Sequence, residues 1–100
     1  MTLLGDALGL VRDERHKQDE KWGPQRHGLP VWLTVLTEEC GEVSERILAL
    51  RSETDPEKRA AIAWQLRQEA TQVAAVAVAL LEHIMEEASQ DEPFPNEVWQ

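Results

Sequence analysis

The stretch that decides the fold is residues 55–88, DPEKRAAIAWQLRQEATQVAAVAVALLEHIMEEA. Asp55 followed by Pro56 is a helix start signal, because aspartate caps a first turn and proline needs no amide hydrogen there. Apolar residues then recur at helical spacing, namely Ile62, Leu66, Val73, Ala77, Leu80, Leu81 and Ile84. The pattern predicts a helix from Pro56 to about Ala88, about 50 Å long at about 1.5 Å per residue.

Two further helices are predicted before this one. The segment from Thr2 to Lys21 carries an apolar stripe in its first half, with Thr2 as a cap. Residues 12–21 are almost wholly charged or polar, so the helix there becomes a solvated arm or ends early. Residues 22–30 hold two glycines and two prolines and are predicted to form an ordered loop. The second helix is expected from Val31 to Leu50.

The predicted fold class is all-α, a helical bundle of about three main helices per chain, because no strand-like alternation is visible. We expect a single domain over residues 1–88, followed by a loose tail over residues 89–100. The apolar helix faces are broad for a chain of 100 residues. A long helix that is apolar on most sides needs a partner, so the bundle is expected to be completed by oligomerisation, as a homodimer or tetramer.

The net charge of the chain limits the classes of function that are expected. The 10 Lys and Arg residues face 19 Asp and Glu residues, which gives a net charge of −9. A protein that binds nucleic-acid duplexes needs a basic surface, and a free polyanion would be repelled unless a cation accompanied it. A single cysteine indicates a reducing compartment, and no secretion signal or membrane-length apolar run is present. A cytoplasmic protein without a membrane partner is expected.

The chemically informative stretch is Glu38-Glu39-Cys40-Gly41-Glu42. Glu39 and Glu42 are three residues apart, so they share a helix face, and an antiparallel third helix could bring Glu69 opposite them. Crowded carboxylates repel one another, and a cation removes that cost. Hard oxygen ligands suit Mg²⁺ or Mn²⁺, which often bridge to substrate phosphates. The alternative is that these glutamates form a solvated acidic face.

The sequence around these glutamates resembles that of a known family. Glu38-Glu39-x-x-Glu42 followed by Glu69-x-x-Gln72 is similar to the EExxE and ExxD signature of the MazG-type all-α nucleoside triphosphate pyrophosphohydrolases. The loop WGPQRH at residues 22–27, followed by Trp32, resembles the stretch that precedes EExxE in the dCTP pyrophosphatase branch. The resemblance spans about Arg15 to Glu82, and it is closest to small MazG-like proteins of bacteria and phages.

The resemblance implies a reaction and a ligand set. Members of the family cleave a nucleoside triphosphate between its α- and β-phosphates, releasing the monophosphate and pyrophosphate, with Mg²⁺ as cofactor. Position by position, the ligands would be Glu39, Glu42, Glu69 and Gln72. Gln72 departs from the family pattern because an amide oxygen carries no charge, which leaves three formal negative charges in place of four.

Other residues have predicted roles with alternatives. Glu38 could orient or deprotonate the attacking water, or it could hold a metal ligand in place. Trp22, His27 and Trp32 could bind the base, although Trp32 could instead be core and Trp22 could anchor the loop. One or two of four basic residues could contact phosphate, the alternative being a solvated face: Arg12, Arg15, Lys17 and Lys21.

The sequence is therefore compatible with three functions. The first is metal-dependent hydrolysis of (deoxy)nucleoside triphosphates, with nucleotide-pool house-cleaning as its role. The second is a non-catalytic MazG-like protein that binds a nucleotide or a partner, which the uncharged Gln72 favours. The third is an acidic helical interaction protein without a ligand, in which the carboxylates are only surface.

Overall fold

The computed structural model describes residues 2–94 and shows three α-helices and no strand within that range. They are α1 (Leu3–Trp22), α2 (Leu29–Ser52) and α3 (Pro56–Glu87). The prediction of an all-α chain with three main helices is confirmed. No helix of the described residues is long and apolar enough to cross a membrane. The end of the predicted tail, residues 95–100, lies outside the described residues.

The helix ends follow the predicted capping chemistry. The Thr2 hydroxyl accepts a hydrogen bond from the Gly5 amide, and the Asp55 carboxylate accepts one from the Lys58 amide. Helix α1 runs unbroken to Trp22, so the prediction that its polar half ends early is wrong, and the burial of Arg15 and Gln18 shows that this half is not a solvated arm either. It stops at Gly23, whose φ of 72° is a left-handed conformation that glycine adopts without strain. Helix α2 begins two residues before the predicted start, with Pro30 in its first turn.

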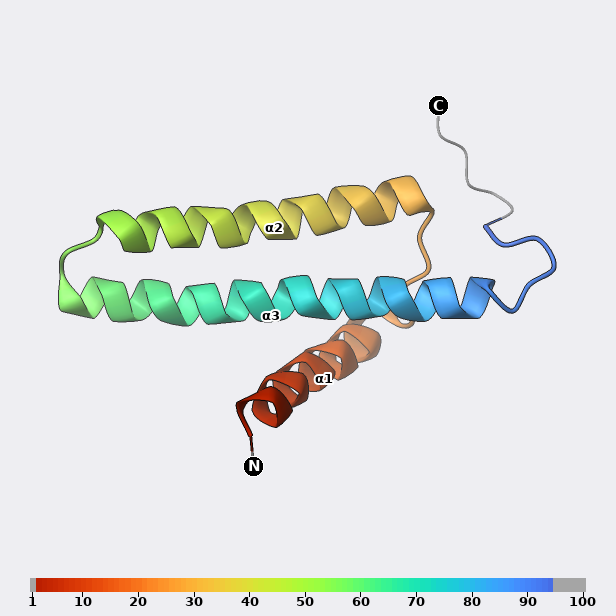
Figure 1. Cartoon of the computed structure of the whole chain (residues 1–100), viewed down its shortest axis with the longest axis horizontal. Coiled ribbons are helices and arrows are strands. Elements are labelled where there is room, and N and C mark those ends of the chain that lie inside the picture. The colour runs from red at the N-terminus through yellow and green to blue at the C-terminus, as the bar shows by residue number, and fades with distance from the viewer. Residues whose placement is uncertain (1, 95–100) are drawn as a thin grey trace.

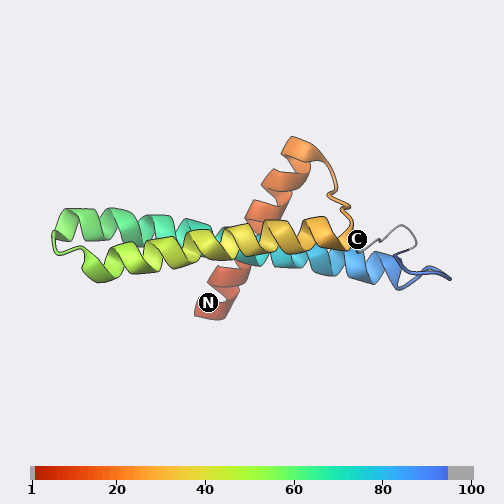
Figure 2. The same cartoon turned by 90° about the horizontal axis from the view of Figure 1, so that it is seen from above.

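Helix α3 is the surface on which the other two helices pack. Helices α2 and α3 form a long antiparallel hairpin, and α1 crosses α3 at a steep angle (Figures 1 and 2). The apolar core is small and lies where the start of α2 meets the second half of α3. Its buried members are Trp32, Val76 and Ala79, flanked by Leu29, Val35, Leu36 and Leu80.

Helix α1 docks on α3 through its polar half rather than through its apolar stripe. Its two buried residues are Arg15 and Gln18, whereas Leu3, Leu4 and Leu8 are exposed. The Arg15 guanidinium donates from Nε to Glu82 of α3 at 2.9 Å and from Nη1 to the Gln18 side-chain oxygen at 3.1 Å. It also pairs with Asp19 at 3.1 Å. Two of the three guanidinium nitrogens are thus hydrogen-bonded inside the α1–α3 junction, and the third is ion-paired with Asp19.

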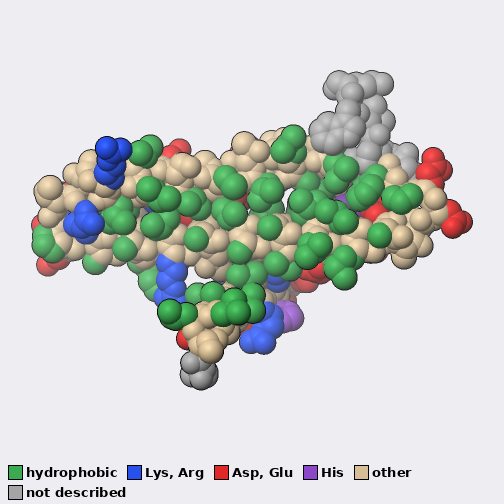
Figure 3. Space-filling model, in the orientation of Figure 1, with side chains coloured by type: hydrophobic (Ala, Val, Ile, Leu, Met, Phe, Trp, Pro, Cys, Tyr) green, Lys and Arg blue, Asp and Glu red, His purple; other side chains and the backbone are tan. Residues whose placement is uncertain are grey.

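Large apolar side chains remain exposed on all three helices (Figure 3). The apolar stripe predicted for α1 therefore faces solvent in the single chain, as do Ile47 and Leu48 of α2 and Trp64 of α3. On the second half of α3 the exposed apolar residues are Val78, Leu81, Ile84 and Met85. A chain with this surface buries only part of the apolar area that its sequence carries.

Replacing Arg15 with methionine tests the polar docking of α1. Arg15→Met keeps the aliphatic bulk but leaves Glu82 and Gln18 without their donor, which should lower the free energy of unfolding by about 2–3 kcal/mol. Arg26→Met is the matched control, because Arg26 forms a more exposed pair with Glu86 and should cost less than about 1 kcal/mol. Urea unfolding at one fixed protein concentration measures both. Equal losses would show that Arg15 does not hold α1 in place.

Candidate metal centre

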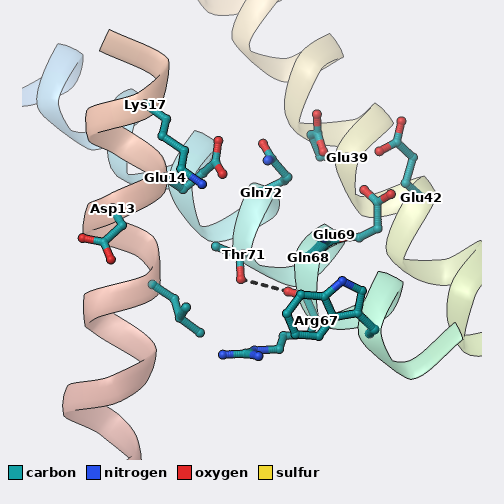
Figure 4. Close-up of a pocket in the computed structure, with 12 residues that line it drawn as sticks. Asp13, Glu14, Lys17, Glu39, Glu42, Arg67, Gln68, Glu69, Thr71 and Gln72 are labelled. Atoms are coloured by element: carbon teal, nitrogen blue, oxygen red, sulfur yellow. Dashed lines mark hydrogen bonds between the residues drawn. The ribbon is translucent and has the colours of Figure 1, made fainter. Parts of the chain in front are cut away.

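Three glutamates from two helices meet at one point of the α2–α3 hairpin. Glu39 and Glu42 of α2 and Glu69 of α3 each present a carboxylate oxygen, and the three oxygens lie within 4.8 Å of one another. The spacing of three residues puts Glu39 and Glu42 on one face of α2, and the antiparallel pairing brings Glu69 across from them (Figure 4). The predicted juxtaposition is confirmed. We refer to these residues as the carboxylate triad.

Two carboxylates of the triad have raised pKa values. Burial raises the pKa of Glu39 above its ordinary value of 4.5, and repulsion by Glu42 adds to the increase. Hydrogen bonding to Glu42 is the main cause that raises the pKa of Glu69, followed by its burial. Arg46, one turn beyond Glu42 on α2, opposes the rise in the pKa of Glu69. Protons therefore bind the triad more tightly than they bind isolated glutamates.

The donor set fits a hard divalent cation. The Oε2 atom of Glu39 is buried and has no hydrogen-bond partner among the described residues. None of the three carboxylates forms an ion pair with a lysine, arginine or histidine within residues 2–94. Carboxylate oxygens are the type of ligand that Mg²⁺ and Mn²⁺ prefer. A bound cation would offset both the repulsion and the unpartnered oxygen.

A large open cavity, which we call the acidic cleft, lies between α1 and the hairpin. Its volume is about 810 Å³, and the carboxylate triad forms one of its walls. The facing wall is α1, which contributes Asp13, Glu14 and Lys17 (Figure 4). Lys17 is thus the one of the four predicted basic residues that lines the cleft beside the triad. Arg15 is buried in the α1–α3 junction, and Lys21 lies 4.6 Å from the Trp22 ring centroid.

Glu14 is a residue of the site that sequence reasoning missed. Its charge is one of the causes that raise the pKa of Glu39, although the two residues come from α1 and α2, which pack on α3 rather than on each other. Glu14 lies in a run of charged residues, a pattern that is typical of a solvated helix face. Its spacing to Lys17 was the available signal, because residues three apart on a helix face the same way.

A second cavity gathers the three predicted base-binding residues. Trp22, His27 and Trp32 all line a pocket of about 200 Å³, which we call the aromatic pocket. The rings of His27 and Trp32 meet edge to face at 4.9 Å, and the side chains of His27 and Gln25 share a hydrogen bond of 2.7 Å. Trp32 is only 3% exposed and belongs to the core, so the alternative that it is a core residue is confirmed, while its contact with a base stays a prediction.

The two cavities meet at Glu39 and Gln72, which line both of them. Gln72 therefore lies beside the triad, as the helix spacing predicted. Glu38 lies outside both cavities on an exposed part of α2, where its charge contributes to the raised pKa of Glu39. The predicted site residues other than Glu38 thus line two adjoining cavities, one acidic and one aromatic.

Comparisons with protein-family models, with curated proteins and with solved structures found no match to this chain. The chemistry of the site therefore has to be inferred from its own side chains.

The raised pKa values of Glu39 and Glu69 predict how stability changes with pH. Just above pH 4.5 the unfolded chain has released these protons while the folded chain retains them, so the unfolding free energy of metal-free protein should fall as pH rises. Excess Mg²⁺ should reduce this fall, because a cation binds the deprotonated carboxylates. Thermal unfolding from about pH 4 to pH 7, in EDTA and in Mg²⁺, measures both effects.

The double variant E39Q/E69Q is the test of this assignment. It should flatten the pH profile in EDTA and remove the response to Mg²⁺. Glu45→Gln is the control, because Glu45 is exposed on α2 and lines neither cavity. An unchanged profile in the double variant would show that the pH response comes from other groups.

Proposed function

We propose that this chain is a metal-dependent pyrophosphohydrolase of the MazG-like type, which converts (deoxy)nucleoside triphosphates to monophosphate and pyrophosphate. The observation that carries the proposal is that the carboxylate triad lines the acidic cleft and that one of its members, Glu39, also lines the aromatic pocket. A nucleotide has the same two ends, an anionic phosphate chain and an aromatic base. Clearing surplus or damaged nucleotides would be the biological role.

Glu39, Glu42 and Glu69 would hold Mg²⁺, with Mn²⁺ as a substitute. When bound, the ion would neutralise phosphate oxygens and activate water as a nucleophile. A bound cation would also allow the chain to bind a triphosphate, because a protein with a net charge of −9 repels a free triphosphate. The unpartnered Glu39 oxygen supports this assignment, since a buried carboxylate oxygen without a donor is costly.

The base would enter the aromatic pocket. Trp22 is 60% exposed at its mouth, so its ring has a free face for stacking. Trp32 lines the same pocket, and its Nε1 has no acceptor among the described residues. His27 can exchange a hydrogen bond with an edge of the base if it releases Gln25. The phosphates would then extend past Glu39 into the acidic cleft, toward Lys17.

The reaction needs a water molecule to attack phosphorus while the bond between the α- and β-phosphates breaks. The role of Glu38 in this step stays a prediction. Because Glu38 is exposed and lines neither cavity, its position favours adjusting the neighbouring ligand Glu39 over taking the proton itself. Glu38→Gln should accordingly reduce turnover less than Glu39→Gln does.

A second candidate function is a non-catalytic protein of the same type that binds nucleotide without turning it over. The observation that favours it is Gln72, whose neutral amide leaves the site with one charge fewer than the family signature. Chromatography of the products separates the two functions, because only the enzyme releases pyrophosphate. An acidic interaction protein without a ligand would show no change in tryptophan fluorescence on titration with Mg²⁺, although Trp22 and Trp32 flank the site.

Neutralising the triad should remove the activity without unfolding the protein. Glu39→Gln, Glu42→Gln and Glu69→Gln should each lower Mg²⁺-dependent pyrophosphate release by about 100-fold or more, while helicity by circular dichroism is kept. The metal-free variants should be as stable as the original protein or more so, because each loses a repulsive charge. A screen of canonical and damaged dNTPs with Mg²⁺ and Mn²⁺ supplies the assay. Full activity in any variant would exclude that residue as a ligand.

We further infer that the functional unit is a homodimer or tetramer in which α2 and α3 of more than one chain share a core. The chain exposes 7457 Å² of surface, whereas a compact monomer of 11.4 kDa is expected to expose about 5,800 Å². The exposed apolar residues of α1, α2 and α3 would supply the contact.

Sedimentation equilibrium at micromolar concentration tests the assembly. The expected result is a dimer or tetramer whose unfolding temperature rises with protein concentration, because association is linked to folding. Leu81→Glu, at a position that is 54% exposed in the single chain, should weaken the assembly. A well-folded monomer at that concentration would exclude a shared core.

A further inference from the structure

We propose that Gln72 is a substrate hydrogen-bond donor, aimed at the α-phosphate of a bound nucleotide, and is not a metal ligand. The proposal rests on the proposed function, since it takes a nucleotide as the substrate, and it replaces the ligand role that the family signature implies for this position. It is carried by a chain of hydrogen bonds that fixes which end of the Gln72 amide faces the cavities.

The chain of hydrogen bonds begins at Arg15. Its guanidinium is 6% exposed and can only donate hydrogen bonds. The Nη1 atom of Arg15 lies 3.1 Å from the side-chain oxygen of Gln18, which is itself 8% exposed. The alternative orientation of the Gln18 amide would place two donors against each other. The buried cation therefore sets Gln18 with its oxygen toward Arg15 and its nitrogen away from it.

The orientation of the Gln18 amide in turn determines that of the Gln72 amide. The Gln18 nitrogen donates to the Gln72 side-chain oxygen at 3.4 Å. An amide ordinarily exchanges its oxygen and nitrogen at little cost, but here the exchange would again oppose two donors. The oxygen of Gln72, the atom that a metal would need, therefore points to Gln18 of α1, on the side away from Glu69 and Glu42. Its Nε2 forms no hydrogen bond to any residue in the described range 2–94 and is left to donate.

The location of this amide selects its target. Gln72 and Glu69 diverge from α3, with Glu69 turned toward Glu42 and Gln72 turned toward the space between Glu39 and α1 (Figure 4). Gln72 lines both the acidic cleft and the aromatic pocket. With the base in the aromatic pocket and the phosphate chain in the acidic cleft, the α-phosphate is the anionic group at the junction. A neutral donor binds it without the repulsion that a fourth carboxylate would add.

The test separates metal binding from nucleotide binding. Mn²⁺ binding to nucleotide-free protein is followed by electron paramagnetic resonance, with Mg²⁺ as competitor. Calorimetry in saturating Mg²⁺ measures the affinities of pyrophosphate and of a panel of nucleoside and deoxynucleoside monophosphates. Gln72→Met removes the donor at nearly constant size, and Gln65→Met is the control, because Gln65 is exposed on α3 and lines neither cavity.

In Gln72→Met the affinity for the best-binding monophosphate should fall about tenfold or more, as expected for a lost hydrogen bond to a charged group. Affinities for Mn²⁺ and for pyrophosphate should stay within about twofold, because neither depends on a donor to the α-phosphate. A fall in Mn²⁺ affinity would identify Gln72 as a ligand and overturn the proposal. Unchanged monophosphate binding would overturn it as well.

Gln72→Glu keeps the test decisive if the methionine variant does not fold. The carboxylate can still accept from Gln18, but it adds charge and removes the donor. Mn²⁺ affinity should stay equal or rise while monophosphate affinity falls, whereas a ligand role predicts that the two rise together. If the unaltered protein binds none of the nucleotides, the proposed function fails and this inference fails with it. If it binds them and both variants bind them equally well, only the assignment of Gln72 fails.

Discussion

The buried guanidinium of Arg15 is the contact on which the arrangement of the two cavities depends. It joins α1 to α3 through Glu82 and orients Gln18, which in turn holds Gln72. Helix α1 supplies one wall of the acidic cleft, and its two buried residues, Arg15 and Gln18, are both polar. A directional polar contact fixes rotation about the helix axis more tightly than an apolar one does. Glu14 and Lys17 therefore face the triad in a defined register.

The carboxylate triad brings three acidic groups close together in the middle of the α2–α3 hairpin. Burial, mutual repulsion and the hydrogen bonding between Glu42 and Glu69 all favour protonation of Glu39 or Glu69. Arg46 opposes only part of the rise in the pKa of Glu69. A bound cation would remove this repulsion, which is the physical reason for proposing a metal at the triad.

Much of the fold and of the site could be predicted from local pattern. The caps at Thr2 and Asp55, the three helices and the shared face of Glu39 and Glu42 all follow from chemistry within a few residues. The pairing with Glu69 needed only a short connection between α2 and α3, which makes the helices antiparallel. Hydrophobic pattern was misleading for α1, because the stripe at Leu3, Leu4 and Leu8 is exposed and the charged segment is docked.

The sequence by itself determined the three helices, the like charges at one level of the hairpin and the aromatic loop before α2. These depend on helix spacing and on turn residues, which act over a few positions. Only the tertiary structure decided that α1 crosses α3, that Glu14 faces Glu39, and that Gln18 engages the oxygen of Gln72. Those contacts join residues more than twenty positions apart. Their geometry is set by the crossing angle of packed helices, and no local pattern encodes that angle.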